Sequence, residues 1–278
     1  MAFCKSRLTH PVRVTPMGFL RSTSAMTLGS IRTRVLVIGL VSGMFEGCAA
    51  GGLCPYSAVF CNEFVLDPIA DLEFFADAHR YRWRGNWVLH NVSEVVSHDM
   101  SPFARDAMEK HKHGPDGWLV RGNTIHRSLD RYLRGEVDLH SDKWSPWIDT
   151  LLSDQLFQGI ETLATEYRVV DRYNSVGGSL DFLVRFKDDK NFVILGDLKT
   201  VSSKKAVSSR KPATAQLGAY AKFLSQFHPK LTVTECVTVV SGPEKCKVIR
   251  QSPEDDCIPA WDELWGRFQA KQAVYYDF

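Results

Sequence analysis

Two acidic residues and a lysine stand in neighbouring apolar segments of the chain. Asp181 follows Gly178, and Asp197 and Lys199 follow the apolar run 192–195. If both segments are adjacent antiparallel strands, the two carboxylates can meet at one end of a sheet, within reach of one divalent cation. Carboxylates with water suit Mg²⁺ or Mn²⁺. A nearby ammonium can hold an attacking water or stabilise charge on a phosphate.

Strand alternation supports a common site for Asp197 and Lys199. Side chains two positions apart project from the same face of a strand, while Leu198 between them points into the core. Each residue also has a simpler interpretation. Asp181 could be a turn or edge residue, and Asp197 with Lys199 could be an ordinary surface ion pair.

Two further segments carry polar groups at informative positions. Gln216 and Tyr220 are four residues apart on an expected helix, so both face one way and, with Lys222, could grip a phosphate or nucleotide. The alternative is that Tyr220 lies at the edge of the core of an amphipathic helix and that Gln216 is solvated. His126 falls at the border of the apolar face of an earlier helix, where a structural role is the alternative to metal ligation.

The elements that must position these residues form a mixed α/β pattern from about residue 71 onward. A hairpin is expected near residues 79–90, with Gly85 and Asn86 at its turn. Three short strands separated by turn signals predict an antiparallel meander. The predicted helices cover residues 122–133, 146–164, 212–227 and 253–274, and the predicted strands cover residues 167–173, 179–186, 192–199 and 231–240.

Taken in order, four motifs resemble those of the RecB-type branch of the PD-(D/E)XK nuclease superfamily, including phage exonucleases and the mitochondrial genome maintenance exonuclease. The motifs are Arg121–Leu133, Gly178–Asp181, Gly196–Thr200 and Gln216–Tyr220. The resemblance spans most of the chain from about residue 71 and implies a restriction-endonuclease-like core, in which helices flank a mixed central sheet containing the meander. Asn123 departs from the threonine common in that family.

The resemblance also implies roles for individual residues. His126, Asp181 and Asp197 would bind Mg²⁺ or Mn²⁺ with the Leu198 carbonyl, and Asp181, Asp197 and Lys199 would be catalytic. Gln216, Tyr220 and Thr200 would contact DNA. Glu166 matches an acidic position that would act behind the ligands or at a second metal.

The implied activity is hydrolysis of DNA, expected as exonuclease action on single-stranded or frayed ends in replication, repair or recombination. Proteins of those processes are possible partners. The alternatives are an endonuclease of the same fold and a catalytically silent DNA-binding or partner subunit.

A formal charge of +2 over 278 residues means that any DNA-binding surface must be local. Lys204, Lys205, Arg210 and Lys211 form a basic run in a Ser-rich stretch that is expected to be a mobile loop and could guide single-stranded DNA to the site. The alternative is a solvated charge run with no role in substrate binding. Trp83 offers a stacking surface for a single strand.

Seven cysteines form no CxxC pair, and their spacing predicts no iron–sulfur cluster. The segment 1–45 contains no Asp or Glu and suits a mitochondrial presequence or sequence translated from a start codon set too early. We therefore expect residues 1–66 to be a poorly structured extension and residues 67–278 to be the nuclease domain. The expected compartment is the cytoplasm of a bacterial or phage-infected cell, or alternatively the mitochondrion, and no membrane association is predicted.

Overall fold

The computed structural model describes residues 66–136 and 142–276. The predicted extension therefore lies, except for Leu66, outside the described residues. Among the helices that are described, none combines the length and the apolar character needed to cross a bilayer.

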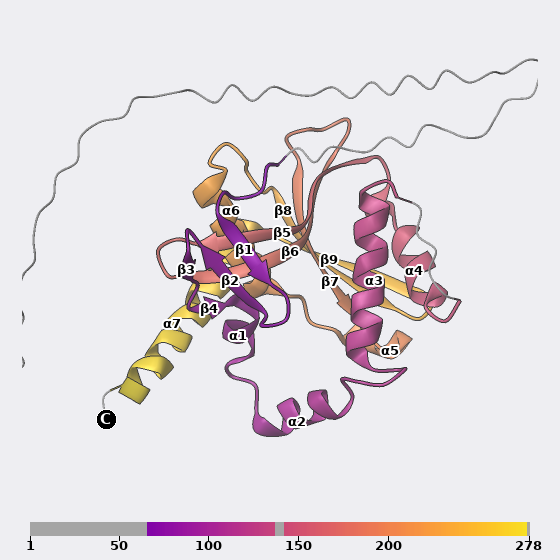
Figure 1. Ribbon diagram of the computed structural model, residues 1–278. Helices are drawn as coiled ribbons and strands as arrows, with labels where there is room; N and C mark the ends of the chain where they lie inside the picture. The colour runs from indigo at the N-terminus through magenta and orange to yellow at the C-terminus, as the bar shows by residue number, and fades with distance from the viewer. Residues whose placement is uncertain (1–65, 137–141, 277–278) are drawn as a thin grey trace, which may run out of the picture. The chain divides into compact units, whose positions relative to one another are not determined.

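Strands occur at the start, in the middle and near the end of the described chain, with helices between them (Figure 1). The strands are β1 (Leu72–Phe75), β2 (Arg80–Trp83), β3 (Asn86–Trp87), β4 (His90–Asn91), β5 (Ile160–Asp171), β6 (Val176–Phe186), β7 (Val193–Thr200), β8 (Glu235–Gly242) and β9 (Lys245–Gln251). The helices are α1 (Val92–Ser97), α2 (Pro102–Lys110), α3 (Trp118–Leu133), α4 (Ser145–Leu152), α5 (Lys204–Ser209), α6 (Thr214–Phe227) and α7 (Ile258–Tyr276). A 3-10 turn covers Gln155–Phe157, and a π-helical turn covers Pro253–Cys257.

The larger sheet is mixed, as expected. Strands β5, β6 and β7 form the antiparallel meander, β7 pairs parallel with β8, and β8 pairs antiparallel with β9. Strand β5 occupies one edge of β6 along almost its full length, so β4 and β7 share the other edge. Because β4 pairs only at Val176 and Gly177 and β7 pairs from Phe182 onward, residues 178–181 have no neighbour on that edge among the described strands. This gap opens the sheet at one place.

Helices cover both faces of this sheet. Ile125 of α3 packs in a core with Leu198, whereas Phe223 of α6 and Trp261 of α7 pack in a second core with Leu195. Leu195 and Leu198 are three positions apart on β7, so strand alternation sends them to opposite faces. Truncating a fully buried leucine of this kind to alanine typically costs about 2–5 kcal/mol.

A smaller antiparallel sheet is built from β1, β2 and β3. The predicted hairpin is present, but its turn lies one residue earlier than expected: Arg84 and Gly85 both have positive φ, and Asn86 already pairs with Trp83. Positive φ at both central residues is what a tight two-residue hairpin requires. Strand β1 was not predicted.

The predicted helix over residues 146–164 is wrong in its second half. Helix α4 ends at Leu152, and Ile160 already pairs with Phe186 as the first residue of β5. Apolar residues continue at helical spacing across this boundary, but the backbone turns at Gly159, where φ is 66°. Tertiary pairing with β6 overrides the local periodicity.

The other differences are smaller. Helix α3 begins at Trp118, four residues before the predicted start. The basic segment predicted as a mobile loop contains α5, capped by the Ser203 side chain, and β9 was not predicted.

Candidate metal centre

A cleft of about 1150 Å³ opens beside the gap in the larger sheet. Gly178, Ser179 and Asp181 of β6 form part of its wall, together with residues of α1, α3, β7 and α6. Pockets for small ligands typically range from about 300 to 1,000 Å³, so this cleft is large enough for a segment of a polymer.

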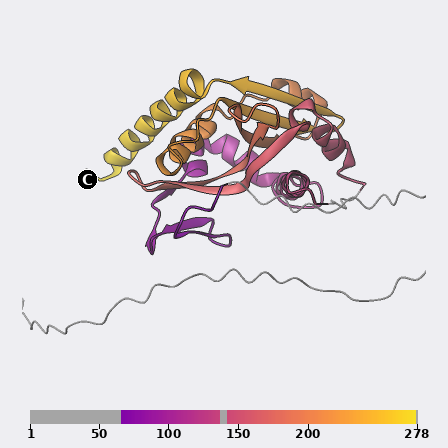
Figure 2. The same cartoon turned by 90° about the horizontal axis from the view of Figure 1, so that it is seen from above.

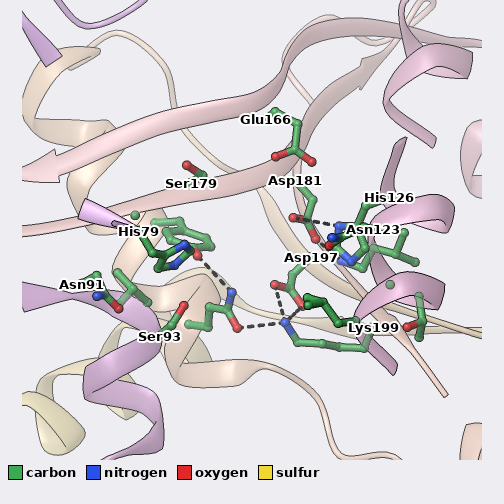
Figure 3. Close-up of a pocket in the computed structure, with 18 of the residues that line it drawn as sticks. His79, Asn91, Ser93, Asn123, His126, Glu166, Ser179, Asp181, Asp197 and Lys199 are labelled. Atoms are coloured by element: carbon green, nitrogen blue, oxygen red, sulfur yellow. Dashed lines mark hydrogen bonds and ion pairs between the residues drawn. The ribbon is translucent and has the colours of Figure 1, made fainter. Parts of the chain in front are cut away.

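His126, Glu166 and Asp181 meet in this cleft. Each offers one ligand atom, and these atoms all lie within 4.8 Å of one another. His126 Nδ1 lies 3.4 Å from Asp181 Oδ1. Figure 3 shows the three side chains converging from α3, β5 and β6. Two carboxylates and an imidazole at this spacing can hold a divalent cation.

Glu166 reaches this cluster through an unusual backbone conformation. Its neighbours Thr165 and Tyr167 pair with Phe182 and Leu180, so Glu166 lies opposite Asp181. Its φ is 46°, a left-handed conformation that a non-glycine residue seldom adopts within a strand. Strain of this kind persists where the surroundings enforce it, and it concentrates at functional sites.

Asp197 and Lys199 form a second group on the other side of Asp181. Lys199 Nζ donates a hydrogen bond of 2.8 Å to Asp197 Oδ1 and lies 2.8 Å from Oδ2. The Leu198 backbone N–H between them donates to Asp181 Oδ2 at 2.5 Å, and the Leu198 side chain is fully buried. The predicted alternation on β7 is confirmed, and the predicted proximity of Asp181 to Asp197 follows from the adjacent register of β6 and β7.

A hydrogen-bonded chain continues from Lys199 into α6. Lys199 Nζ donates to Gln216 Oε1 at 3.0 Å, and Gln216 Nε2 donates to the Tyr220 hydroxyl at 3.0 Å. Tyr220 can pack this closely because Gly178 has no side chain: a Cβ there would lie 2.7 Å from the tyrosine ring. The prediction that Gln216 and Tyr220 face the same way is confirmed.

The charges of the cleft are unevenly compensated. Burial and the charge of Asp181 raise the pKa of Glu166 to about 7. Burial also raises the pKa of Asp197, to about 6, with Asp181 adding to the effect and Lys199 opposing it. Burial alone would lower the pKa of His126, but Asp181, Glu166 and Asp197 together raise it to about 9. Burial likewise opposes ionisation of Asp181, yet His126, Lys199 and the Leu198 N–H lower its pKa.

Three carboxylates of the cleft therefore share two cationic groups, His126 and Lys199, and burial penalises their charge, so an added cation would favour their ionised forms. A second observation agrees with this: Asp197 Oδ2 is buried, and although the Lys199 ammonium lies 2.8 Å away as an ion-pair partner, the oxygen accepts no hydrogen bond among the described residues. Buried oxygens normally accept hydrogen bonds, so this oxygen retains lone-pair capacity for a ligand. The oxygen-rich donor set fits Mg²⁺ or Mn²⁺, and the imidazole fits a transition metal such as Mn²⁺ better than it fits Mg²⁺.

The remaining predicted site residues divide into two groups. Thr200 and Arg210 line the cleft. Lys204 pairs with Glu244 outside it, and Lys205 does not line it either, so the structure does not bring these two lysines to the cluster. Lys222 is also directed elsewhere, because its ammonium donates to Asp262.

Sequence reasoning missed several polar residues of the cleft wall. Asn123 and Arg127 of α3 lie on the same helical face as His126, and this spacing could have identified them. Ser93 of α1 and His79 before β2 also line the cleft (Figure 3). No signal in the sequence links these two residues to the cluster, because the pairing of β4 with β6 and the packing of the small sheet bring them there.

Comparisons with known proteins do not assign the chain to a family. No family model matches it, and no curated protein matches it in sequence. It is similar to a solved structure titled "Crystal structure of SSO0001", with 14% identity, 66% of this chain and 75% of that chain covered, and a TM-score of 0.36. A similarity of this size supports no conclusion about the site.

Proposed function

We propose that this protein is a metal-dependent DNA nuclease of the PD-(D/E)XK type, acting as an exonuclease on single-stranded or frayed ends. The observation that carries the proposal is the convergence of His126, Glu166 and Asp181 beside the Asp197–Lys199 pair. A restriction-endonuclease-like core is part of the same proposal. The mixed sheet with its β5–β6–β7 meander and flanking helices supports it.

The residues that would hold the cation are His126, Asp181 and Asp197, with Glu166 close enough to join them. A divalent cation bound there would act as a Lewis acid on the phosphate and would lower the pKa of a water bound to it. A carboxylate oxygen of Glu166 lies within 4.8 Å of the ligand atoms of His126 and Asp181, close enough to contact the same metal ion directly. We therefore include it among the proposed ligands.

Besides the metal ion, we propose that the Lys199 ammonium supplies positive charge for catalysis. The ammonium has three donors, and Asp197 and Gln216 accept two of them. The third can hold a water or a phosphate oxygen at the cleft. In hydrolysis, water forms a new P–O bond, the bond to one sugar oxygen breaks, and that oxygen leaves with a proton. Positive charge beside the phosphate stabilises the negative charge that develops during this exchange.

The size of the cleft and the polar residues of its wall favour a polymer over a small phosphate ester. Arg127 and Arg210 add positive charge to the wall, where a sugar–phosphate backbone would need it. Thr200 and Tyr220 complete the proposed substrate contacts, and Gln216 holds the Lys199 ammonium in position.

The experiment compares end-labelled linear single-stranded DNA with a covalently closed circle, in Mg²⁺ and in Mn²⁺. The variants are Asp197→Ala and Lys199→Ala, and Asp262→Asn serves as a control on a surface ion pair. We expect the linear strand alone to be degraded, both site variants to be inactive and the control to remain active. Cleavage of the circle would replace the exonuclease assignment by an endonuclease. Binding of DNA with no cleavage in either metal would overturn the catalytic proposal in favour of a DNA-binding or partner subunit.

A further inference from the structure

The small sheet carries aromatic and arginine side chains together on one face. Strand pairing places Phe75 opposite Arg80, and Arg82 opposite both Glu73 and Trp87, so all five side chains project to the same side. The opposite face carries Phe74, Tyr81 and Trp83, which belong to or pack against a small core of the domain. We call the side formed by Glu73, Phe75, Arg80, Arg82 and Trp87 the outer face.

The rings and guanidinium groups of the outer face lie in contact with one another. The ring centroids of Phe75 and Trp87 are 5.0 Å apart, with the ring planes inclined at 59°. Arg80 Cζ lies 4.6 Å from the Trp87 centroid, and Arg82 Cζ lies 5.0 Å from that of Phe75. Trp87 nevertheless remains 46% exposed. Figure 2 shows the small sheet projecting from the β5–β6 layer, with no described helix or strand beyond it.

The small sheet also borders the cleft. Phe74, His79 and Tyr81 line the cleft wall, and the Tyr81 hydroxyl lies 3.0 Å from Ser179 Oγ on β6. A Cβ at Gly177 would lie 2.7 Å from the Tyr81 ring, so the glycine allows the hairpin to pack directly on the strand that carries Asp181. The strand residues that line the cleft belong to the inner face of the small sheet, opposite the outer face, so a polymer leaving the cleft on this side would reach the outer face by passing round the edge of that sheet.

The chemistry of the outer face fits a single nucleic-acid strand. Unpaired bases stack on exposed aromatic rings, each worth about 1–3 kcal/mol, and arginines contact both the bases and the phosphates between them. On the outer face Arg80 and Arg82 outnumber the one acidic residue, Glu73, although the whole chain is close to neutral. A duplex would hide its bases from the rings, and an apolar protein partner would leave the arginines without an anion.

We infer that the outer face is an accessory platform for single-stranded nucleic acid, which holds nucleotides beyond those in the cleft. The inference rests on the proposed function, because it takes the strand in the cleft to be the one that the platform extends. Two stacked bases and two phosphate contacts on the platform would make affinity depend on strand length. Short strands that fill only the cleft would not use the platform.

The test measures binding of labelled oligothymidylate by fluorescence anisotropy in EDTA, where no metal-dependent cleavage occurs. The two lengths are about 6 nucleotides, near the lower end of the usual site sizes for single-strand binding, and about 20 nucleotides, above the upper end. The variants are Trp87→Ala and the double variant Arg80→Ala/Arg82→Ala. We expect each to weaken binding of the long strand by about 10-fold or more and to leave the short strand within about 2-fold. The arginine variant should also show a shallower salt dependence, because each lost phosphate contact reduces the slope by about 0.7.

Three further variants separate the platform from a loss of folding. Trp87→Phe keeps a stacking ring and should restore most of the affinity. Glu73→Gln removes the carboxylate that pairs with Arg82 at 2.6 Å and should tighten long-strand binding, the opposite direction to any folding defect. Arg250→Ala is a matched control, since Arg250 is an exposed strand arginine paired with Glu235 on the larger sheet, and its removal should change nothing.

The outcomes distinguish this inference from the proposed function. If the wild type cleaves DNA but the platform variants bind both lengths like the wild type, the platform is overturned and the nuclease stands. If long strands bind in a platform-dependent way but are not cleaved in Mg²⁺ or Mn²⁺, the platform stands and the nuclease fails. If no strand binds in EDTA, the platform is overturned, and the cleavage assay in Mg²⁺ and Mn²⁺ decides the nuclease separately. An oligouridylate arm compares RNA with DNA, and preference for a duplex over either strand would overturn the platform.

Discussion

The two sides of the cleft differ in how completely their charges are satisfied. On the α3 side, His126, Glu166 and Asp181 bring two carboxylates together with only one cationic partner among them. On the α6 side, Asp197 is paired with Lys199, and the chain continues through Gln216 to Tyr220 by hydrogen bonds. The first side therefore has one carboxylate charge more than its cationic partner balances, and the proposed metal ion would balance it. The second already contains its own, and its hydrogen bonds hold the ammonium in place.

The largest expected effect is on the α3 side. Asp181→Asn keeps the shape of the side chain and an acceptor for the Leu198 N–H, but removes the charge shared by the cluster. We expect activity to fall by about 10²–10³-fold or more, as for the loss of a group that stabilises charge in the transition state. Initial rates on linear single-stranded DNA measure it, with circular dichroism to confirm folding. Near wild-type activity would show that the metal lies elsewhere.

Glu166→Gln tests whether Glu166 belongs to the metal centre. Loss of a group beside a metal ligand typically costs about 10–100-fold, and loss of a ligand costs more. We expect at least a 10-fold loss together with weaker activation by Mn²⁺, measured by titrating the metal at constant substrate. Glu161→Gln is a matched control on the same strand, where the carboxylate pairs with Arg185 away from the cleft. An equal loss in both variants would point to damage to β5 instead.

On the α6 side, the expected effect of Gln216→Ala is smaller. Removing one of the two acceptors of Lys199 should lower kcat by about 5- to 10-fold, the equivalent of one lost hydrogen bond, with little change in KM. Gln216→Glu keeps an acceptor for the ammonium and should recover part of kcat. A change confined to KM would instead make Gln216 a substrate contact, the role that the sequence resemblance implies.

The smallest expected effect is a change in thermal stability in the absence of metal. Replacing either of two glutamates of β5 by glutamine should change Tm, in opposite directions for the two positions. The pKa of Glu166 is raised to about 7, so its charge destabilises the fold above that pH, and Glu166→Gln should raise Tm by about 1–3 °C at pH 8. The pKa of Glu161 is lowered, chiefly by its hydrogen bond to Arg185. Its charge therefore adds stability above the unfolded pKa, which is lost as the pH falls, and Glu161→Gln should lower Tm slightly at pH 8.

Differential scanning fluorimetry in EDTA, at pH 4 and at pH 8, measures both shifts. At pH 4 Glu166 is protonated in the folded protein, so Glu166→Gln should have little effect there. A higher Tm for Glu166→Gln at pH 8 together with its lower activity would identify a carboxylate kept for function at a cost in stability. If both variants shift Tm in the same direction at pH 8, the claim that charge on Glu166 destabilises the fold while charge on Glu161 stabilises it is refuted.

Local patterns in the sequence determined which side chains share a face. The two-residue spacing of Asp197 and Lys199 places them together on β7, and the four-residue spacing of Gln216 and Tyr220 does the same on α6. The meander was predictable for the same reason, because its turns and its β-rich segments are encoded in short stretches. Periodicity of this kind depends only on bond geometry within one element.

Only the tertiary structure decided which faces meet. Glu166 joins His126 and Asp181 through a left-handed backbone that no glycine signals, and Lys204 turns to Glu244 instead of the cleft. The gap at residues 178–181 exists because β4 and β7, far apart in the chain, share one edge of β6. These features depend on pairing and packing between distant segments, where the free energy of the whole core outweighs the preference of any short stretch.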